Sequence, residues 1–162
     1  MDKIVFATAN EGKVKEIKEI LKDFPIEVVS MKEMGITADI EENGATFEEN
    51  SLIKARALVK LTGLPALADD SGLEVDYLNG EPGIYSARYL GRDTDYDYKN
   101  NYIIDKLKDA KDEERSARFV CVISLVLPDG REFVKKGVME GRIGYEIKGE
   151  NGFGYDPIFY LP

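Results

Sequence analysis

The segment Lys3–Ile17, KIVFATANEGKVKEI, near the start of the sequence gives the clearest indication of the fold class. Its first residues, Lys3–Ala7, are nearly all apolar and predict a short buried strand. A turn at Thr8–Gly12 follows, and Asn10 is suited to cap a helix after it. Beyond the turn, apolar residues recur at the spacing of one helix face: Val14, Ile17, Ile20 and Leu21. The order strand, turn, helix predicts an α/β fold.

Further along the sequence the same signals alternate. Strands are predicted over Glu27–Ser30, 66–68, 73–77, Ser116–Leu127, Glu132–Gly141 and Arg142–Ile147, and helices from Thr46 to about Leu61 and over Asp95–Asp109. Asp69–Gly72 is predicted as a turn, and Pro128–Gly130 as the turn of a β-hairpin. In the strand Ser116–Leu127, one face is expected to hold Ala117, Phe119, Cys121, Ile123, Leu125 and Leu127. The whole predicts an elongated mixed sheet with flanking helices.

The length and composition limit the function. A sequence of 162 residues, 43% hydrophobic and 33% charged, forms one globular domain or two small lobes at most. With 22 basic and 31 acidic residues the net charge is −9, which argues against nucleic acid or an anionic membrane as a partner. No stretch approaches the roughly 18 apolar residues of a membrane span, and no secretory signal is recognisable. The single Cys121 fits a cytoplasmic location.

The sequence contains no histidine. A Ser-His-Asp triad, a Cys-His dyad and a His-ligated zinc site are therefore excluded within it. Its chemistry must come from carboxylates, lysines, hydroxyls, tyrosines or backbone amides. Carboxylate oxygens suit Mg²⁺, with Mn²⁺ as a possible substitute.

Two segments stand out as sites of chemistry. Thr8-Ala9-Asn10-Glu11-Gly12-Lys13 joins a strand to a helix, whose first amides and Lys13 would bind phosphate; the alternative is an ordinary turn with a surface lysine. Asp69-Asp70-Ser71-Gly72 follows a buried strand, and packing does not require two adjacent acids there. They are the best metal ligands and general base in the sequence, the alternative being a solvated turn.

Three further segments are weaker. Glu41 and Glu42 lie outside the second helix and are better placed to bind a metal than the acids in its first turn, although such acids more often form a solvated surface. Phe153-Gly154-Tyr155-Asp156 would stack on and read a base, or else pack over the core. Arg88 would contact phosphate or form a structural ion pair.

Taken together, the segments resemble the inosine triphosphate pyrophosphatase, or Ham1, family. The matching stretches are ATANEGKVKEI at 7–17, TFEENSLIKARA at 46–57, ALADDSGLEVDYLNGEPGIYSARY at 66–89, ARFVCVISL at 117–125 and GFGYDPIF at 152–159. They lie in the family's order and span nearly the whole sequence. ADDSGL and GFGYDPIF are the most specific.

The resemblance implies hydrolysis of ITP, dITP and XTP to the monophosphate and pyrophosphate, which cleanses the nucleotide pool. It implies an elongated α/β fold of two lobes around a central cleft, a homodimer and a requirement for Mg²⁺. Carried over by position, Asp70 is the base and a metal ligand, and Glu41 is a second metal ligand. The implied substrate contacts are Thr8, Ala9, Asn10, Glu11, Gly12, Lys13, Lys54, Ser71, Phe153, Gly154, Tyr155 and Asp156.

The family pattern continues beyond GFGYDPIF with a Ser-His-Arg motif on a final helix that helps to read the purine. The sequence given stops at Leu161-Pro162, so this base-reading tail is expected to be missing. Two other hypotheses therefore stay open. One is a nucleotide-binding module without turnover, and the other is a Maf-like pyrophosphatase with a different substrate preference.

Overall fold

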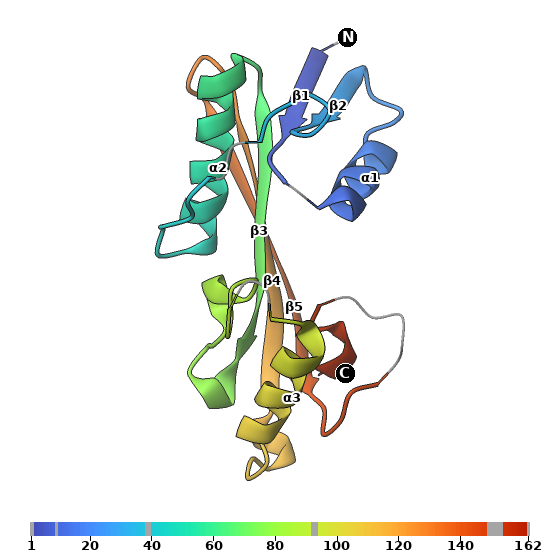
Figure 1. Ribbon diagram of the computed structural model, residues 1–162, viewed down its shortest axis with the longest axis vertical. Helices are drawn as coiled ribbons and strands as arrows, with labels where there is room; N and C mark the ends of the chain where they lie inside the picture. Colours follow the sequence, from blue (N-terminus) through green and yellow to red (C-terminus); the bar gives the residue numbers. More distant parts are fainter. Residues whose placement is uncertain (1, 9, 38–39, 92–93, 149–153, 162) are drawn as a thin grey trace. The chain divides into compact units, whose positions relative to one another are not determined.

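The structure is a computed structural model that describes residues 2–8, 10–37, 40–91, 94–148 and 154–161 (Figure 1). Its chain separates into two compact units, Met1–Asp70 with Val122–Lys136, and Ser71–Cys121 with Gly137–Pro162. One six-stranded sheet has the strand order β2-β1-β3-β4-β5-β6. Parallel strands joined through helices come first and a hairpin comes late, which confirms the predicted mixed α/β class.

In the first unit, β1 (Asp2–Phe6) pairs in parallel with both β2 (Ile26–Ser30) and β3 (Ala66–Val75). The two faces of these strands bury different helices. On one face α2 (Phe47–Thr62) packs Ala55 and Leu58 on Val5, and on the other α1 (Glu11–Ile20) packs Val14 on Phe6. Figure 1 shows the two helices on opposite sides of the strands.

Both helices of the first unit begin at the predicted caps. The Asn10 side-chain oxygen accepts hydrogen bonds from the amides of Gly12 at 2.9 Å and Lys13 at 3.2 Å. Thr46 Oγ1 accepts a hydrogen bond from the Glu49 amide at 3.0 Å. These side chains satisfy amides that the first helical turn leaves without an intrahelical partner.

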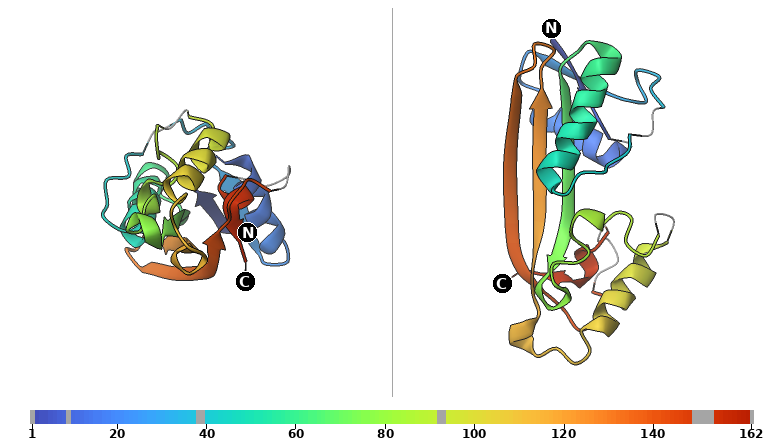
Figure 2. Two further views of the ribbon diagram at one scale, coloured as in Figure 1. Left: turned by 90° about the horizontal axis from the view of Figure 1, so that it is seen from below. Right: turned by 90° about the vertical axis from the view of Figure 1, so that its left-hand side faces the viewer.

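The second unit packs α3 (Tyr96–Lys106) on its part of the sheet. The strands there belong to β3, β4 (Ser116–Val126), β5 (Glu132–Ile143) and β6 (Phe159–Tyr160), and the short 3₁₀ turns are Asp76–Leu78, Gly83–Tyr85, Asp112–Glu114 and Asp156–Ile158. Leu73, Ile103 and Ile158 lie in its core. β4 and β5 run side by side as the predicted hairpin (Figure 2). β5 continues to Ile143, so the separate strand predicted over Arg142–Ile147 is wrong except for its first two residues.

The turn predicted at Asp69–Gly72 is wrong, because these residues lie inside the single strand β3. Asp, Ser and Gly favour turns locally, but β3 has β1 on one side and β4 on the other. Incorporation into the sheet outweighs a local preference. Gly72 accordingly does not adopt a positive φ. The two acids are thus held in a strand interior instead of in a solvated turn.

The predicted face of β4 is also wrong over much of its length. Ala117 is buried as expected, but Cys121 and Ile123 are exposed while Val120, Val122 and Val126 are buried. Both faces of this strand are apolar, so alternation alone does not identify the buried one. Among the described residues, every helix is too short or too polar to cross a bilayer.

Candidate active site

The site in the first unit is built where β1 ends and β3 continues. β1 and β3 are aligned with Phe6 opposite Leu67, and the Ala7 amide donates a hydrogen bond to the Leu67 carbonyl at 2.8 Å. Asp69 lies in β3 two residues after Leu67, near the segment that connects β1 to α1. Polar groups beyond the carboxyl ends of parallel strands are a common location for ligand sites in α/β folds.

Lys13 reaches from the first turn of α1 to this end of β3. Its Nζ lies 2.7 Å from Asp69 Oδ2. Asp69 is only 6% exposed, whereas the Lys13 side chain is 35% exposed. The pair places an accessible cation beside the helix N-terminus, where backbone amides already favour an anion.

A second lysine approaches the same strand from α2. Lys54 Nζ lies 2.8 Å from Glu42 Oε1, and it also donates a hydrogen bond to the Asp69 carbonyl. The Lys54 side chain is 16% exposed and that of Glu42 is 25% exposed. Lys13 and Lys54 therefore approach Asp69 from different helices, one at its carboxylate and the other at its backbone.

Asp70 is the most perturbed acid of the site. It is 8% exposed, and burial raises the pKa of its carboxyl from 3.8 to about 6, with Glu42 and Asp69 adding to the increase and Lys54 opposing it. Its Oδ2 is buried and has no hydrogen-bond partner among the described residues. A buried acid left in this state costs stability, and such acids concentrate in active sites.

The residues fit a hard divalent cation in part. A carboxylate oxygen without a partner, close to further acids, is the type of ligand that Mg²⁺ uses, and Mg²⁺ needs only one or two protein carboxylates besides water and substrate phosphate. Within the described ranges no group of three or more acids is already assembled to hold a metal. Two of the acids near Asp70 are instead paired with Lys13 and Lys54.

The other predicted residues of the first unit are placed as follows. Thr8 Oγ1 accepts a hydrogen bond from the Asn10 amide at 3.1 Å, and Asn10 itself is the helix cap. Glu11 is exposed. A Cβ at Gly12 would lie 3.1 Å from the capping oxygen of Asn10, so glycine leaves that cap undisturbed. Glu41 is exposed, and the ion pair with Lys54 is made by its neighbour Glu42.

Two of the predicted residues, Ala9 and Phe153, lie outside the described residues. The remaining ones belong to the second unit. Ser71 is half-buried in β3, and Asp156 is exposed. Tyr155 is buried, donates a hydrogen bond from its hydroxyl to the Ser86 carbonyl at 2.6 Å, and packs edge-on against Tyr96. Burial raises the pKa of the Tyr155 hydroxyl.

The Gly154 carbonyl accepts a hydrogen bond from the Asn100 side chain at 3.1 Å. The described part of the predicted base-reading segment is therefore anchored to its own unit. A substrate contact by this segment stays a prediction.

Sequence reasoning missed Asn50 and did not choose between Glu41 and Glu42. Asn50 lies in the first turn of α2, four residues before Lys54, so both point from the same helix face. It is completely buried, and its amide is close enough to Asp70 to lower that carboxyl's pKa. The sequence signal that could have identified Asn50 is its position four residues before Lys54, a predicted substrate contact.

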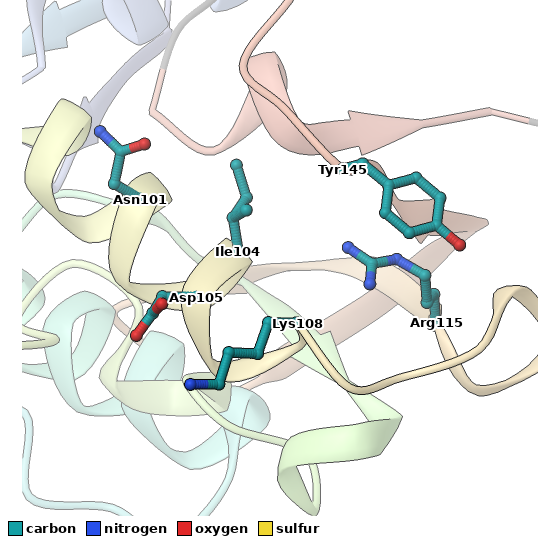
Figure 3. A pocket seen from close by; sticks show the side chains of 6 residues that line it. All are labelled: Asn101, Ile104, Asp105, Lys108, Arg115 and Tyr145. Carbon is teal, nitrogen blue, oxygen red and sulfur yellow. The ribbon is translucent and has the colours of Figure 1, made fainter.

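A separate hollow of about 550 Å³ lies in the second unit (Figure 3). Its lining is Asn101, Ile104, Asp105, Lys108, Arg115 and Tyr145. Arg115 is buried there and donates to the carbonyls of Leu107, Ile143 and Gly144, beneath the Tyr145 ring. Its guanidinium is thus engaged by the fold, and none of the residues predicted to act on substrate lines this hollow.

Comparisons with known proteins identify the family. The Ham1 family model matches residues 4–162. The chain is 49% identical to the dITP/XTP pyrophosphatase of Clostridium perfringens, covering 100% of this chain and 82% of the relative, and 51% identical to that of a Thermus thermophilus strain, covering 99% and 76%.

Solved structures give the same result. A HAM1 protein from Coxiella burnetii superposes with a TM-score of 0.93 at 46% identity, covering 100% of this chain and 83% of that one. The nucleoside-triphosphatase / dITP/XTP pyrophosphatase from Mycobacterium abscessus gives a TM-score of 0.86 at 45% identity, covering 98% and 83%. These matches cover 98 to 100% of this chain. This chain therefore belongs to the Ham1 family.

Proposed function

We propose that this protein hydrolyses non-canonical purine nucleoside triphosphates, ITP, dITP and XTP, to the monophosphate and pyrophosphate. The observation that carries the proposal is the buried Asp70, which has an unpartnered oxygen and lies among residues that approach it from α2 and β3. Relatives whose sequences are 49 and 51% identical to this chain are named dITP/XTP pyrophosphatases, which supports the substrate class.

The site meets the needs of phosphoryl transfer without histidine. The reaction requires positioning, an activated water and neutralisation of negative charge. The positive end of the α1 dipole and the Lys13 ammonium attract the triphosphate, and Lys54 adds a cation from α2. Asp70, with a pKa of about 6, is mostly ionised at neutral pH yet basic enough to accept a proton from water.

We also propose Mg²⁺ as the cofactor, held by Asp70 with Glu41 or Glu42. When bound it would neutralise charge on the phosphates. Lys54 pairs with Glu42, so transfer of Lys54 to a phosphate would release that carboxylate from this ion pair. Glu41→Gln and Glu42→Gln decide between the two acids, because the true ligand's variant should need about tenfold more Mg²⁺ for half-maximal activity. If neither variant changes the Mg²⁺ requirement, both assignments fail.

The base is proposed to contact the segment Phe153–Asp156, and the protein is proposed to act as a cytoplasmic homodimer. Support for a dimer comes from β5, where Phe133, Val134, Val138 and Met139 are 42 to 52% exposed. Exposed apolar side chains in such number on one strand are typical of an interface. Sedimentation should give twice the 18.2 kDa chain mass, and a monomer at micromolar concentration contradicts the proposal.

The central test is pyrophosphate release with Mg²⁺ from ITP and XTP, compared with ATP and GTP. We expect kcat/KM to be at least tenfold higher for the non-canonical pair, a discrimination that one or two polar contacts to the base can supply. Equal rates on all four would remove the purine selectivity. Binding of ITP by calorimetry without any product would instead identify a module that binds and does not turn over.

A further inference from the structure

Two consecutive polar residues of α3, Lys99 and Asn100, are buried in the second unit. Lys99 is 0% exposed and Asn100 is 1% exposed. Burial of such side chains is costly unless hydrogen bonds offset it. Lys99 Nζ donates to the Ala87 carbonyl at 3.0 Å, and Asn100 Nδ2 donates to the Gly154 carbonyl at 3.1 Å. The two side chains therefore hold the backbone of two other segments against α3.

The two segments are also joined to each other. The Tyr155 hydroxyl donates a hydrogen bond to the Ser86 carbonyl at 2.6 Å. The Tyr155 ring packs edge-on against Tyr96 of α3, with 5.1 Å between the ring centres. The Lys99 ammonium lies 4.5 Å from the centre of the same Tyr96 ring. Residues 86–87, residues 154–155 and α3 thus form one connected set of contacts within the second unit.

Gly154 is the position in this set that most needs an external contact. Its φ is +57°, in the left-handed region that favours glycine. Glycine loses more conformational freedom on folding than any other residue, so a fixed backbone here is costly in entropy. Asp156, two residues later, is exposed and begins the 3₁₀ turn Asp156–Ile158. The placement of Gly154 therefore helps to set the placement of this exposed residue.

The orientation of the Asn100 amide follows from the same contact. The Gly154 carbonyl can only accept a hydrogen bond, so Nδ2 faces it and Oδ1 is at the other end of the amide. The buried Oδ1 has no hydrogen-bond partner among the described residues. A buried acceptor in that state costs stability, which an aliphatic side chain would avoid. Packing alone does not explain an asparagine at position 100, whereas the hold on Gly154 does.

We propose that Asn100 is a specificity-determining positioning residue, which holds Gly154 so that the segment Phe153–Asp156 is preorganised to contact the purine base. The inference rests on the proposed function, because that function assigns the base to this segment. The role of Asn100 does not require contact with the base or the phosphates. A segment already fixed in its binding conformation loses less entropy when the ligand binds. Loss of Asn100 should therefore weaken recognition of the base and leave phosphoryl transfer intact.

Asn100→Ala removes the donor to Gly154. We expect kcat/KM for ITP to fall about tenfold, mainly through KM, because the base contact is made less often. The value for ATP should stay within about threefold of wild type, since ATP gains little from that contact. Val75→Ala, at a completely buried position on β3 in the same unit, is the control for lost stability. It should keep the wild-type ratio of kcat/KM for ITP to kcat/KM for ATP.

A purely structural role for Asn100 gives another pattern. Asn100→Ala would then lose thermal stability as Val75→Ala does, with an unchanged ratio of ITP to ATP turnover. That result overturns the proposal, and so does an equal fall in kcat/KM for both nucleotides. Unchanged kinetics in a folded Asn100→Ala variant overturns it as well.

Nuclear magnetic resonance of the wild-type protein tests the same inference even if the variant does not fold. With Mg²⁺, a non-hydrolysable ITP analogue should shift the Asn100 side-chain amide and the Gly154 backbone amide. Inorganic tripolyphosphate, which has no base, should shift the amides of Gly12 and Lys13 and leave Asn100 and Gly154 unchanged. No shift at Asn100 and Gly154 with the analogue, or the same shift with both ligands, overturns the inference. The proposed function fails separately, if the wild-type protein releases no pyrophosphate from any of the four nucleotides.

Discussion

Arg115 in the second unit and Asp70 in the first are both buried ionisable side chains, but their surroundings differ. The Arg115 guanidinium donates to three backbone carbonyls at 2.6 to 2.9 Å and lies 4.0 Å from the centre of the Tyr145 ring. Asp70 Oδ2 has no partner among the described residues, and burial raises the pKa of Asp70.

The difference separates a structural charge from a functional one. A buried charge whose hydrogen bonds are satisfied by the fold connects elements and has little left to offer a ligand. A buried charge that the fold leaves unsatisfied costs stability, and it is retained where substrate, water or metal completes it. The comparison predicts that loss of Arg115 affects folding, whereas loss of Asp70 affects turnover.

The largest expected effect is on stability, from Arg115→Met. It leaves the carbonyls of Leu107, Ile143 and Gly144 buried without their donor, which should lower the free energy of unfolding by about 3–5 kcal/mol. Urea unfolding measures the loss, and kcat per folded molecule should stay near wild type. If the free energy of unfolding falls by less than about 1 kcal/mol, Arg115 has no structural role and the contrast with Asp70 fails.

Asp70→Asn should have the opposite signature. We expect kcat for ITP to fall by about 10² or more, because the amide cannot accept the proton from water. Near-UV circular dichroism should remain that of wild type. Asp109→Asn, an exposed acid after α3, is the control. Full activity in Asp70→Asn would mean that another group is the base.

The pH dependence of stability sharpens the same point. Because the folded-state pKa of Asp70 is about 6 and the unfolded value is 3.8, the folded state binds more protons between these pH values. Stability due to this group is therefore present at low pH and lost as pH rises through about 6, by about 2–3 kcal/mol.

In metal-free buffer, Asp70→Asn should accordingly gain stability over wild type between pH 4 and pH 7.5. Urea unfolding at the two pH values measures the gain, and EDTA keeps bound metal from masking it. A difference between variant and wild type that does not change with pH would show that Asp70 titrates normally.

The smallest expected effect comes from Lys13→Ala. The lysine is partly exposed and binds phosphate in parallel with the α1 amides, so KM for ITP should rise about tenfold with kcat little changed. Lys15→Ala, exposed on the same helix, is the control for general charge loss. If the two variants have equal KM values, Lys13 has no specific role in the phosphate loop.

Much of the first unit could be predicted from sequence, because its signals are local. Asn10 and Thr46 cap the helices as their side chains predict. Asp70 could be singled out, because two adjacent acids after an apolar run are not explained by packing. Its burial could not be predicted, since the Asp-Ser-Gly sequence favours a turn, whereas the structure continues β3 through these residues.

The remaining features depend on contacts between distant residues. Glu41 and Glu42 are equivalent in sequence, and only the approach of Lys54 distinguishes them. The role of Asn50 depends on its interactions with Gly44 and Asp70, neither of which is its neighbour in sequence. Arg115 lies in no recognisable motif, because arginine is usually a surface residue and its three carbonyl partners come from two separate segments.

Attack of water on the α-phosphorus at Asp70 is the central step of the proposed reaction, and hydrolysis of ITP in ¹⁸O-labelled water with Mg²⁺ tests it. Mass spectrometry of the products should find one labelled oxygen in the inosine monophosphate and none in the pyrophosphate. Label in the pyrophosphate would place the attack on the β-phosphorus and contradict the proposed geometry.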